Sequence, residues 1–173
     1  LMDLVLLSPT SFNIQNWRFV VVRDAEQKQA VRAAAWDQAQ VTDSCFTVVL
    51  CGDVKAWGKN PQRYWADAPK ATQEMLVPMI GQFYSNAGEA TQHDEVMRSA
   101  GIAGQTLMLA AKSMDYDSCP MDGFDFDSVA EIINLPEDHA ICMFVAIGKG
   151  LDEPPPPKDK LPIGEVVITD RFD

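Results

Sequence analysis

The chain has 173 residues, a formal net charge of −11 and a hydrophobic content of 47%. This length and composition are those of one globular domain with a full core, which excludes a disordered protein. The negative charge repels phosphates at long range and so excludes nonspecific binding of nucleic acid or of an anionic membrane surface. Any phosphate that the protein binds must therefore be held by a local group of basic residues.

The four cysteines indicate free thiols. Cys45, Cys51, Cys119 and Cys142 include no CxxC pair and have no histidine at metal-ligand spacing, so neither a zinc site nor a disulfide framework is expected. Free thiols are typical of a reducing cytosol, and the chain has no apolar run of about eighteen residues that could span a membrane. We expect a cytoplasmic protein without a metal site, whose upstream portion is missing because no Met begins the sequence.

The first half of the chain predicts two buried strands separated by a helix. Residues 1–7 resemble the last turns of a helix that runs into a polar loop. Aromatic and β-branched residues at 17–22 predict a strand, helix formers at 25–35 predict a helix, and the apolar run at 46–51 predicts a second strand. Unbroken apolar runs belong to strands covered on both faces, so helices should lie on both sides of the sheet. No boundary is predicted within residues 54–94.

The strongest helical pattern lies at residues 95–112. Apolar residues recur there on two faces, which predicts a helix that is buried on all sides. The small residues Ser99, Gly101 and Gly104 would let another backbone approach closely, which suits a helix at the centre of a dimer. A plain core helix packed within one subunit explains the pattern equally well.

The second half then predicts a loop at 115–126, a short helix at 127–134 and a third strand at 140–147. The prolines at 154–157 should run extended and carry the end of the chain away from that strand. Residues 165–169 have strand propensity and could add to a sheet edge in a neighbouring subunit. Strands that alternate with helices indicate an α/β or α+β fold with a mixed sheet.

Hydroxyl and amide side chains gather between the first helix and the first strand, in the segment Ser8-Pro-Thr-Ser-Phe-Asn-Ile-Gln-Asn-Trp-Arg-Phe19. Such a loop can direct polar groups at a ligand while rigid elements hold it, although local capping of a turn uses the same residue types. The order closely resembles the nitroreductase family signature, Pro-Ser-Ser-x-Asn-x-Gln-Pro-Trp-x-Phe. Only Thr10 and Asn16 depart from it.

In that family this loop reaches across the dimer interface to an FMN that is bound mainly by the other subunit. The resemblance implies flavin contacts from one side of the loop, made by Pro9, Thr10, Ser11 and Asn13. It also implies that Gln15 supports the loop and that Phe12 faces the substrate side of the ring. The Asn16 departure affects only the turn into the strand.

A second segment, Cys119-Pro-Met-Asp-Gly-Phe-Asp125, resembles the family's Pro-x-Glu-Gly-Phe-Asp. The resemblance implies that Asp122 and Gly123 present backbone groups to the isoalloxazine near N5, where hydride arrives. Gly123 has no Cβ, so its backbone can approach a flat ring closely, although an ordinary turn would also require a glycine. Asp122 is one methylene shorter than the family's Glu, which places the implied contact on the backbone.

A third match and a fourth, weaker one complete the pattern. The segment Lys158-Asp-Lys-Leu-Pro162 resembles the family's Lys-x-Arg-x-Pro tail, in which Lys158 and Lys160 would hold the flavin phosphate. Solvated tail lysines are the alternative, and Lys160 lacks the bidentate fork of an arginine. Gln40, or in second place Gln38, would lie against the pyrimidine edge of the flavin, although glutamines at the surface end of a helix are as common.

The resemblance covers nearly the whole chain, with its motifs in the family's order. It implies one nitroreductase-like domain over residues 1–173, of the α+β class in α/β/α layers, with a mixed central sheet and without its N-terminal helix and phosphate-binding motif. It further implies an intertwined homodimer that exchanges a C-terminal strand between subunits. Without the upstream motif, we expect this chain in isolation to bind FMN weakly or not at all.

The implied activity is that of an FMN-dependent oxidoreductase that uses NADH or NADPH to reduce nitroaromatics, quinones or related small acceptors by a ping-pong mechanism. The chemistry would take place at flavin N5, so no side chain, including His93, His139 and Ser11, is assigned as a catalytic acid, base or nucleophile. Two alternatives stay open. The chain could be a specialised dehalogenating, dehydrogenating or flavin-consuming enzyme of the same fold, or a noncatalytic flavin-binding dimer.

Overall fold

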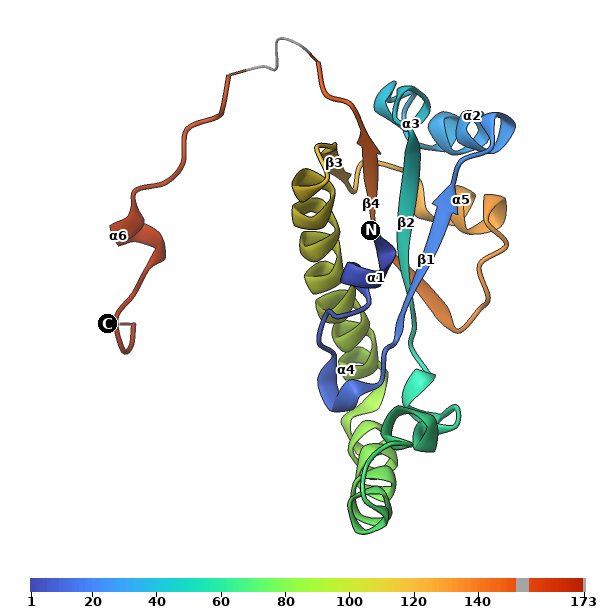
Figure 1. Cartoon of the computed structure of the whole chain (residues 1–173), viewed down its shortest axis with the longest axis vertical. Helices are drawn as coiled ribbons and strands as arrows, with labels where there is room; N and C mark the ends of the chain where they lie inside the picture. The colour runs from blue at the N-terminus through green and yellow to red at the C-terminus, as the bar shows by residue number, and fades with distance from the viewer. Residues whose placement is uncertain (152–155, 173) are drawn as a thin grey trace.

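The computed structural model describes residues 1–151 and 156–172, and it is organised around an antiparallel sheet with strand order β1-β2-β4-β3 (Figure 1). The strands are β1 (Trp17–Val22), β2 (Phe46–Asp53), β3 (Asp117–Met121) and β4 (His139–Gly148). The α-helices are α1 (Met2–Val5), α2 (Ala25–Ala34), α3 (Gln40–Asp43), α4 (Lys70–Ser113), α5 (Phe126–Ile132) and α6 (Ile163–Val166). Short 3-10 helices are η1 (Ser11–Asn13), η2 (Ala56–Gly58) and η3 (Pro61–Trp65).

Side chains of β2 alternate between two cores, which gives the molecule its layers. Val49 and Cys51 pack with α2 and α5 on one face, whereas Val48 and Leu50 pack with α1 and α4 on the other. This is the period-two pattern of a strand that is covered on both sides. The α+β class with α/β/α layers is therefore confirmed.

Three of the four strands match the predicted ones, and β2 continues two residues beyond its predicted end. Every pairing among the described residues is antiparallel, so the parallel pair that a mixed sheet requires is not found within them. The prediction of a plain loop at 115–126 is wrong, because β3 forms there. Pro120 lies in β3, and proline is tolerated because this strand is an edge of the sheet.

Helix α4 begins at Lys70 and so includes much of the segment to which no structure was assigned. Its second half matches the predicted helix, but it is not buried on all sides, because Ile102 is 41% and Leu109 is 63% exposed in the single chain. Gly104 packs inside the chain, where an added Cβ would lie 3.1 Å from Leu50. The exposed face of α4 leaves room for a second copy, while Gly104 serves the packing within one chain.

A third core cluster lies beyond the end of the sheet and consists mainly of aromatic residues. Tyr64 and Tyr84 are buried there with Ile14, and Phe12 and Trp57 pack against them. Tyr84 also stacks on Trp57, with ring centroids 5.9 Å apart. This cluster joins η3 and the first half of α4 to the polar loop that precedes β1.

The C-terminal arm, residues 156–172, is exposed throughout and runs away from the sheet (Figure 1). The predicted strand at 165–169 is wrong for the single chain, because α6 takes up Glu165 and Val166 and no strand follows among the described residues. A strand needs a hydrogen-bonding neighbour, and residues 156–172 pair with no strand among the described residues. Pro154 and Pro155 lie outside the described residues. Within the described ranges, no helix combines the length and hydropathy needed to cross a membrane.

Candidate functional site

Loop 8–16, which contains most of the residues that the first motif singles out, has a strained backbone. Phe12, Asn13 and Gln15 adopt positive φ angles of 50°, 54° and 43°. Each such residue costs on the order of 1 kcal/mol, and strain of this kind gathers at binding sites. Thr10 Oγ1 accepts a 3.0 Å hydrogen bond from the Gln15 N–H, which holds the turn closed.

The loop is anchored from outside by η3. The side-chain amide of Asn13 donates to the Tyr64 carbonyl oxygen at 2.9 Å, and the Trp65 indole donates to the Phe12 carbonyl oxygen at 3.0 Å. Gln15 donates from its side chain to Asn13 Oδ1 at 3.3 Å. Gln15 therefore supports the loop, and the anchoring residues come from a segment that sequence reasoning could not assign.

The ring of Phe12 belongs to an aromatic surface beside the loop. Its centroid lies 5.6 Å from that of Phe83 and 6.1 Å from that of Tyr84. Phe83 is 46% exposed, so this surface continues out to solvent. Flat apolar molecules are the ligands that such rings contact well.

Several buried polar atoms near the loop have no hydrogen-bond partner among the described residues. These atoms are Ser8 Oγ, Asn16 Oδ1, Trp17 Nε1, Trp57 Nε1 and Tyr84 Oη. Burial raises the pKa of the Tyr84 hydroxyl, so this group stays protonated and can donate. Buried polar groups are normally paired, and three unpaired ones within residues 8–17 mark this region as one that fits a polar partner.

A second group forms around Gly123. The side-chain amide of Gln38 donates to the Gly123 carbonyl oxygen at 2.7 Å, and Gln40 donates to Gln38 Oε1 at 3.0 Å. A Cβ on Gly123 would lie 2.9 Å from Cζ3 of Trp36, so glycine is required for this close approach. The structure thus brings both glutamines to the second motif. Gln38, the second choice from the sequence, is the one that touches Gly123, while the side chain of Asp122 is exposed.

A cleft of about 560 Å³ lies along β3, with Gln40 on its wall. Its wall has further polar residues that were not predicted from the sequence, among them Ser118, Cys119 and Lys149. The Lys149 ammonium lies 4.4 Å from the centre of the Tyr116 ring and supplies a positive charge at this wall. The signal for β3 is weak in the sequence, so nothing there indicated that its side chains face a cleft.

The predicted site residues do not meet within one chain. Loop 8–16 leads into β1 and Gly123 follows β3, and these strands are the opposite edges of the sheet. Three strand spacings separate the edges, which amounts to about 14 Å. Lys158 and Lys160 are exposed and belong to the C-terminal arm, which runs away from the sheet (Figure 1). Within one chain the three groups therefore stay apart.

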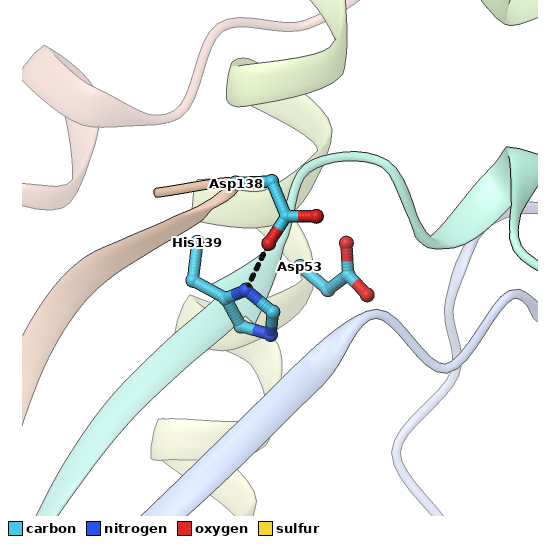
Figure 2. Close-up of side chains that lie close together, drawn as sticks. All are labelled: Asp53, Asp138 and His139. Carbon is cyan, nitrogen blue, oxygen red and sulfur yellow. Dashed lines mark hydrogen bonds and ion pairs between the residues drawn. The ribbon is translucent and has the colours of Figure 1, made fainter. Parts of the chain in front are cut away.

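Polar residues also gather where β2 ends and β4 begins, as Figure 2 shows. Ligand atoms of Asp53, Asp138 and His139 lie within 4.8 Å of one another, and Asp138 is 2.7 Å from His139 Nδ1. The Lys59 ammonium binds both carboxylates, at 2.9 Å from Asp53 and 2.5 Å from Asp138. Burial lowers the pKa of Lys59, but its hydrogen bonds to the two carboxylates outweigh this and raise it. Lys59 therefore serves as the cation of this cluster.

Comparison with known proteins places this arrangement in context. The profile of the Nitroreductase family matches residues 1–149. Protein DrgA of Synechocystis sp. is 44% identical over 170 residues, which cover 95% of this chain and 80% of that protein. MhqN of Bacillus subtilis, assigned as an NAD(P)H nitroreductase, is 32% identical over 171 residues, covering 95% and 83% of the two chains. A protein of Exiguobacterium sibiricum, assigned as a nitroreductase and solved in complex with FMN, superimposes with a TM-score of 0.89 at 29% identity, covering 96% and 82%.

Proposed function

This chain belongs to the nitroreductase family, and we propose that it is an FMN-dependent oxidoreductase that takes electrons from NADH or NADPH and passes them to nitroaromatics, quinones or related flat acceptors. One observation carries the proposal. The strained loop 8–16 and the Gly123 group, which match the family's flavin motifs, lie on opposite edges of one sheet. Each edge thus offers half of a site that a second copy completes.

The residues present fit FMN. Unpaired buried polar atoms at Ser8 and Asn16 mark the loop as a region for a polar ligand. The missing Cβ of Gly123 gives a flat ring access to the backbone, and the amides of Gln38 and Gln40 lie beside it. Lys158 and Lys160 supply the local positive charge that a phosphate needs in a protein of net charge −11.

We further propose that two copies assemble as a homodimer. On α4, Ile102 and Leu109 present apolar surface to solvent, and apolar side chains recur along the C-terminal arm at Leu161, Ile163 and Phe172. An interface between two copies would remove these side chains from water. In the dimer, the arm would lie on the neighbouring subunit and bring its lysines to the shared site.

A bound flavin supplies hydride acceptance and electron donation at N5. The chain's own residues would position the ring and its partners. Pro9, Thr10, Ser11 and Asn13 would contact the ring from one subunit, and the Gly123 and Asp122 backbone would do so from the other. Phe12, with Phe83 beside it, would form an apolar wall that orients a flat acceptor and excludes water. No side-chain acid or base is required in this scheme.

The first experiment asks whether the protein binds and turns over flavin. The purified protein is titrated with FMN, and NADH or NADPH is then added without oxygen. Loss of the yellow colour and its return on adding a quinone support the proposal. Colour that persists indicates a flavin-binding protein without reductase activity, and failure to bind flavin contradicts the proposal.

A second experiment tests whether the site is shared. Asn13→Ala and Gly123→Val each damage both sites of a homodimer, but a mixed dimer contains one intact site if the loop of one copy faces Gly123 of the other. Exchange of subunits at random should then restore about one quarter of the wild-type sites. If the loop and Gly123 of the same copy form the site, mixing restores nothing.

A further inference from the structure

Asp53, at the end of β2, is a buried carboxylate with an unusual number of donors. It is 3% exposed, and it accepts hydrogen bonds from the Lys55 N–H at 2.9 Å and from the Lys59 ammonium at 2.9 Å. The Arg18 guanidinium lies 3.5 Å from the same carboxylate. A buried charge is costly unless it is paired, so these donors explain how Asp53 is tolerated.

Arg18 connects this carboxylate to loop 8–16. Its Nη1 donates to the Gln15 carbonyl oxygen at 3.0 Å and to the Trp17 carbonyl oxygen at 2.8 Å, while Nη2 faces Asp53. The backbone N–H of Asp53 also donates to the Asn16 carbonyl oxygen at 2.8 Å. A planar guanidinium holds the two carbonyls and the carboxylate with donors on two separate nitrogens, whereas a lysine carries all its donors on one nitrogen.

Gln15 is the last strained residue of the loop, with a φ of 43°. Strained backbone persists only where its surroundings over-determine it. The carbonyl of Gln15 is fixed by Arg18, and its N–H is fixed by Thr10. At the end of the loop nearest β1, the Gln15 carbonyl is therefore held by Arg18, whose other terminal nitrogen faces Asp53.

We propose that Asp53 is a positioning residue, which acts through Arg18 to hold loop 8–16 in the conformation that receives the flavin. The identity of the ligand in this inference rests on the proposed function. The effect of Asp53 on the order of the loop does not. Asp53 itself contacts no residue of the second group around Gly123. The Lys59–Asp138 ion pair forms a separate branch of the same cluster, which ties the segment after η2 to the start of β4.

The variants separate the contact of Asp53 with Arg18 from the contact of Lys59 with Asp138. Asp53→Asn keeps the shape of the side chain but removes the charge that faces Arg18. Arg18→Lys keeps the charge but loses the planar fork, at a position whose side chain is 37% exposed. Asp138→Asn is the matched control, because it removes the other carboxylate of Lys59 and leaves Asp53 and Arg18 in contact.

The first measurement is hydrogen–deuterium exchange of the whole chain without FMN. In Asp53→Asn and Arg18→Lys, amides of residues 10–16 should exchange about 10-fold faster or more, while amides of β2 and β4 keep their wild-type rates. Asp138→Asn should leave the loop amides within about twofold of wild type. Unchanged loop exchange in Arg18→Lys, or equal acceleration in Asp138→Asn, would overturn the proposal.

The second measurement is the FMN dissociation constant at a temperature at which every variant is folded. Asp53→Asn and Arg18→Lys should each weaken FMN binding about 10-fold, and the double variant should be no weaker than either single one, because both act on one connection. Additive losses would contradict the inference. If the wild-type chain does not bind FMN, only the proposed function is contradicted. The exchange experiment still decides whether Asp53 orders the loop.

Discussion

The side chain of Gln38 donates a 2.7 Å hydrogen bond to the carbonyl oxygen of Gly123, which lies 85 positions further along the chain. This bond joins the connection between α2 and α3 to the connection between β3 and α5. The Trp36 ring covers the same glycine, and Phe124 beside it stacks on Phe144 with ring centroids 3.9 Å apart. The surface around Gly123 is therefore built before any ligand arrives, and a preorganised site loses less free energy on binding.

Replacing Gly123 with alanine should disturb this surface. The new Cβ would lie 2.9 Å from Trp36 Cζ3 and 3.4 Å from Gln38 Nε2. We expect a loss of about 1 kcal/mol in the free energy of unfolding, at the low end for overpacking because Trp36 is 72% exposed and can move. FMN binding should weaken as well, because the Trp36 ring moves or the new Cβ covers the backbone of residue 123. Urea unfolding and FMN titration measure the two effects.

Gly81 provides the control for that substitution. It lies within α4, and an added Cβ would meet no atom within 4 Å. Gly81→Ala should therefore stabilise the chain by up to about 1 kcal/mol through helix propensity and leave FMN binding unchanged. If both alanine variants stabilise the chain and bind FMN equally well, the close approach at Gly123 is unimportant.

The strands that the sequence predicts are those whose own residues carry a strand pattern. Residues of β1, β2 and β4 are rich in apolar and β-branched side chains, and β2, in the middle of the sheet, is covered by helices on both faces. Strand β3 escaped prediction because Asp117 and Pro120 are poor strand residues, and only its neighbour β4 pairs it. The first half of α4 escaped because its packing partners, such as Tyr64 and Phe12, come from distant segments.

Part of the candidate site could likewise be predicted from the sequence, and part of it could not. The order of residues in loop 8–16 and around Gly123 indicates a flavin site by resemblance. The contacts that hold these segments are long-range bonds to backbone carbonyls, such as Asn13 to Tyr64 and Gln38 to Gly123. A carbonyl is present at every residue, so no sequence pattern distinguishes the one that accepts. The wall of the cleft along β3 was missed for the same reason as β3 itself.

The four thiols should differ in reactivity. Cys45 and Cys119 are exposed, whereas burial, with a smaller effect of Cys142, raises the pKa of Cys51 to about 12. Since the thiolate is the nucleophile, iodoacetamide at neutral pH should alkylate Cys45 and Cys119 first and leave Cys51 unmodified. Cys119 lines the cleft along β3, so FMN should slow its alkylation while Cys45 reacts at an unchanged rate. Peptide mass spectrometry follows each site, and fast labelling of Cys51 would contradict its burial.

The C-terminal arm should be needed for the dimer. A chain that ends after Glu153 loses the exposed apolar residues Leu161, Ile163 and Phe172, and we expect it to sediment as a monomer or as an unstable dimer. The paired control is Lys158→Ala with Lys160→Ala, which should remain dimeric and bind FMN more weakly because only the positive charge is lost. A stable dimer of the shortened chain would refute the role of the arm in assembly.

Acid should weaken the N-terminal cap of α5, and the substitution Asp125→Asn isolates this effect. Asp125 caps this helix by accepting a 2.7 Å hydrogen bond from the Ser128 N–H, and this bond holds the pKa of Asp125 below its ordinary value. The unfolded chain therefore binds this proton at a higher pH than the folded chain does. It follows that the stabilisation is complete above the unfolded pKa of about 3.9 and is lost as the pH falls through the folded pKa.

Asp125→Asn introduces a residue that caps helices equally well but does not titrate. Near neutrality the wild type should be the more stable of the two, because the carboxylate also interacts favourably with the N-terminal end of the helix. Below about pH 4 this advantage should shrink and disappear, because the wild-type side chain becomes neutral. Urea midpoints of both chains at pH 7, 5 and 3 give the difference directly, and a difference that stays constant over this range would show that the hydrogen bond does not depress the pKa.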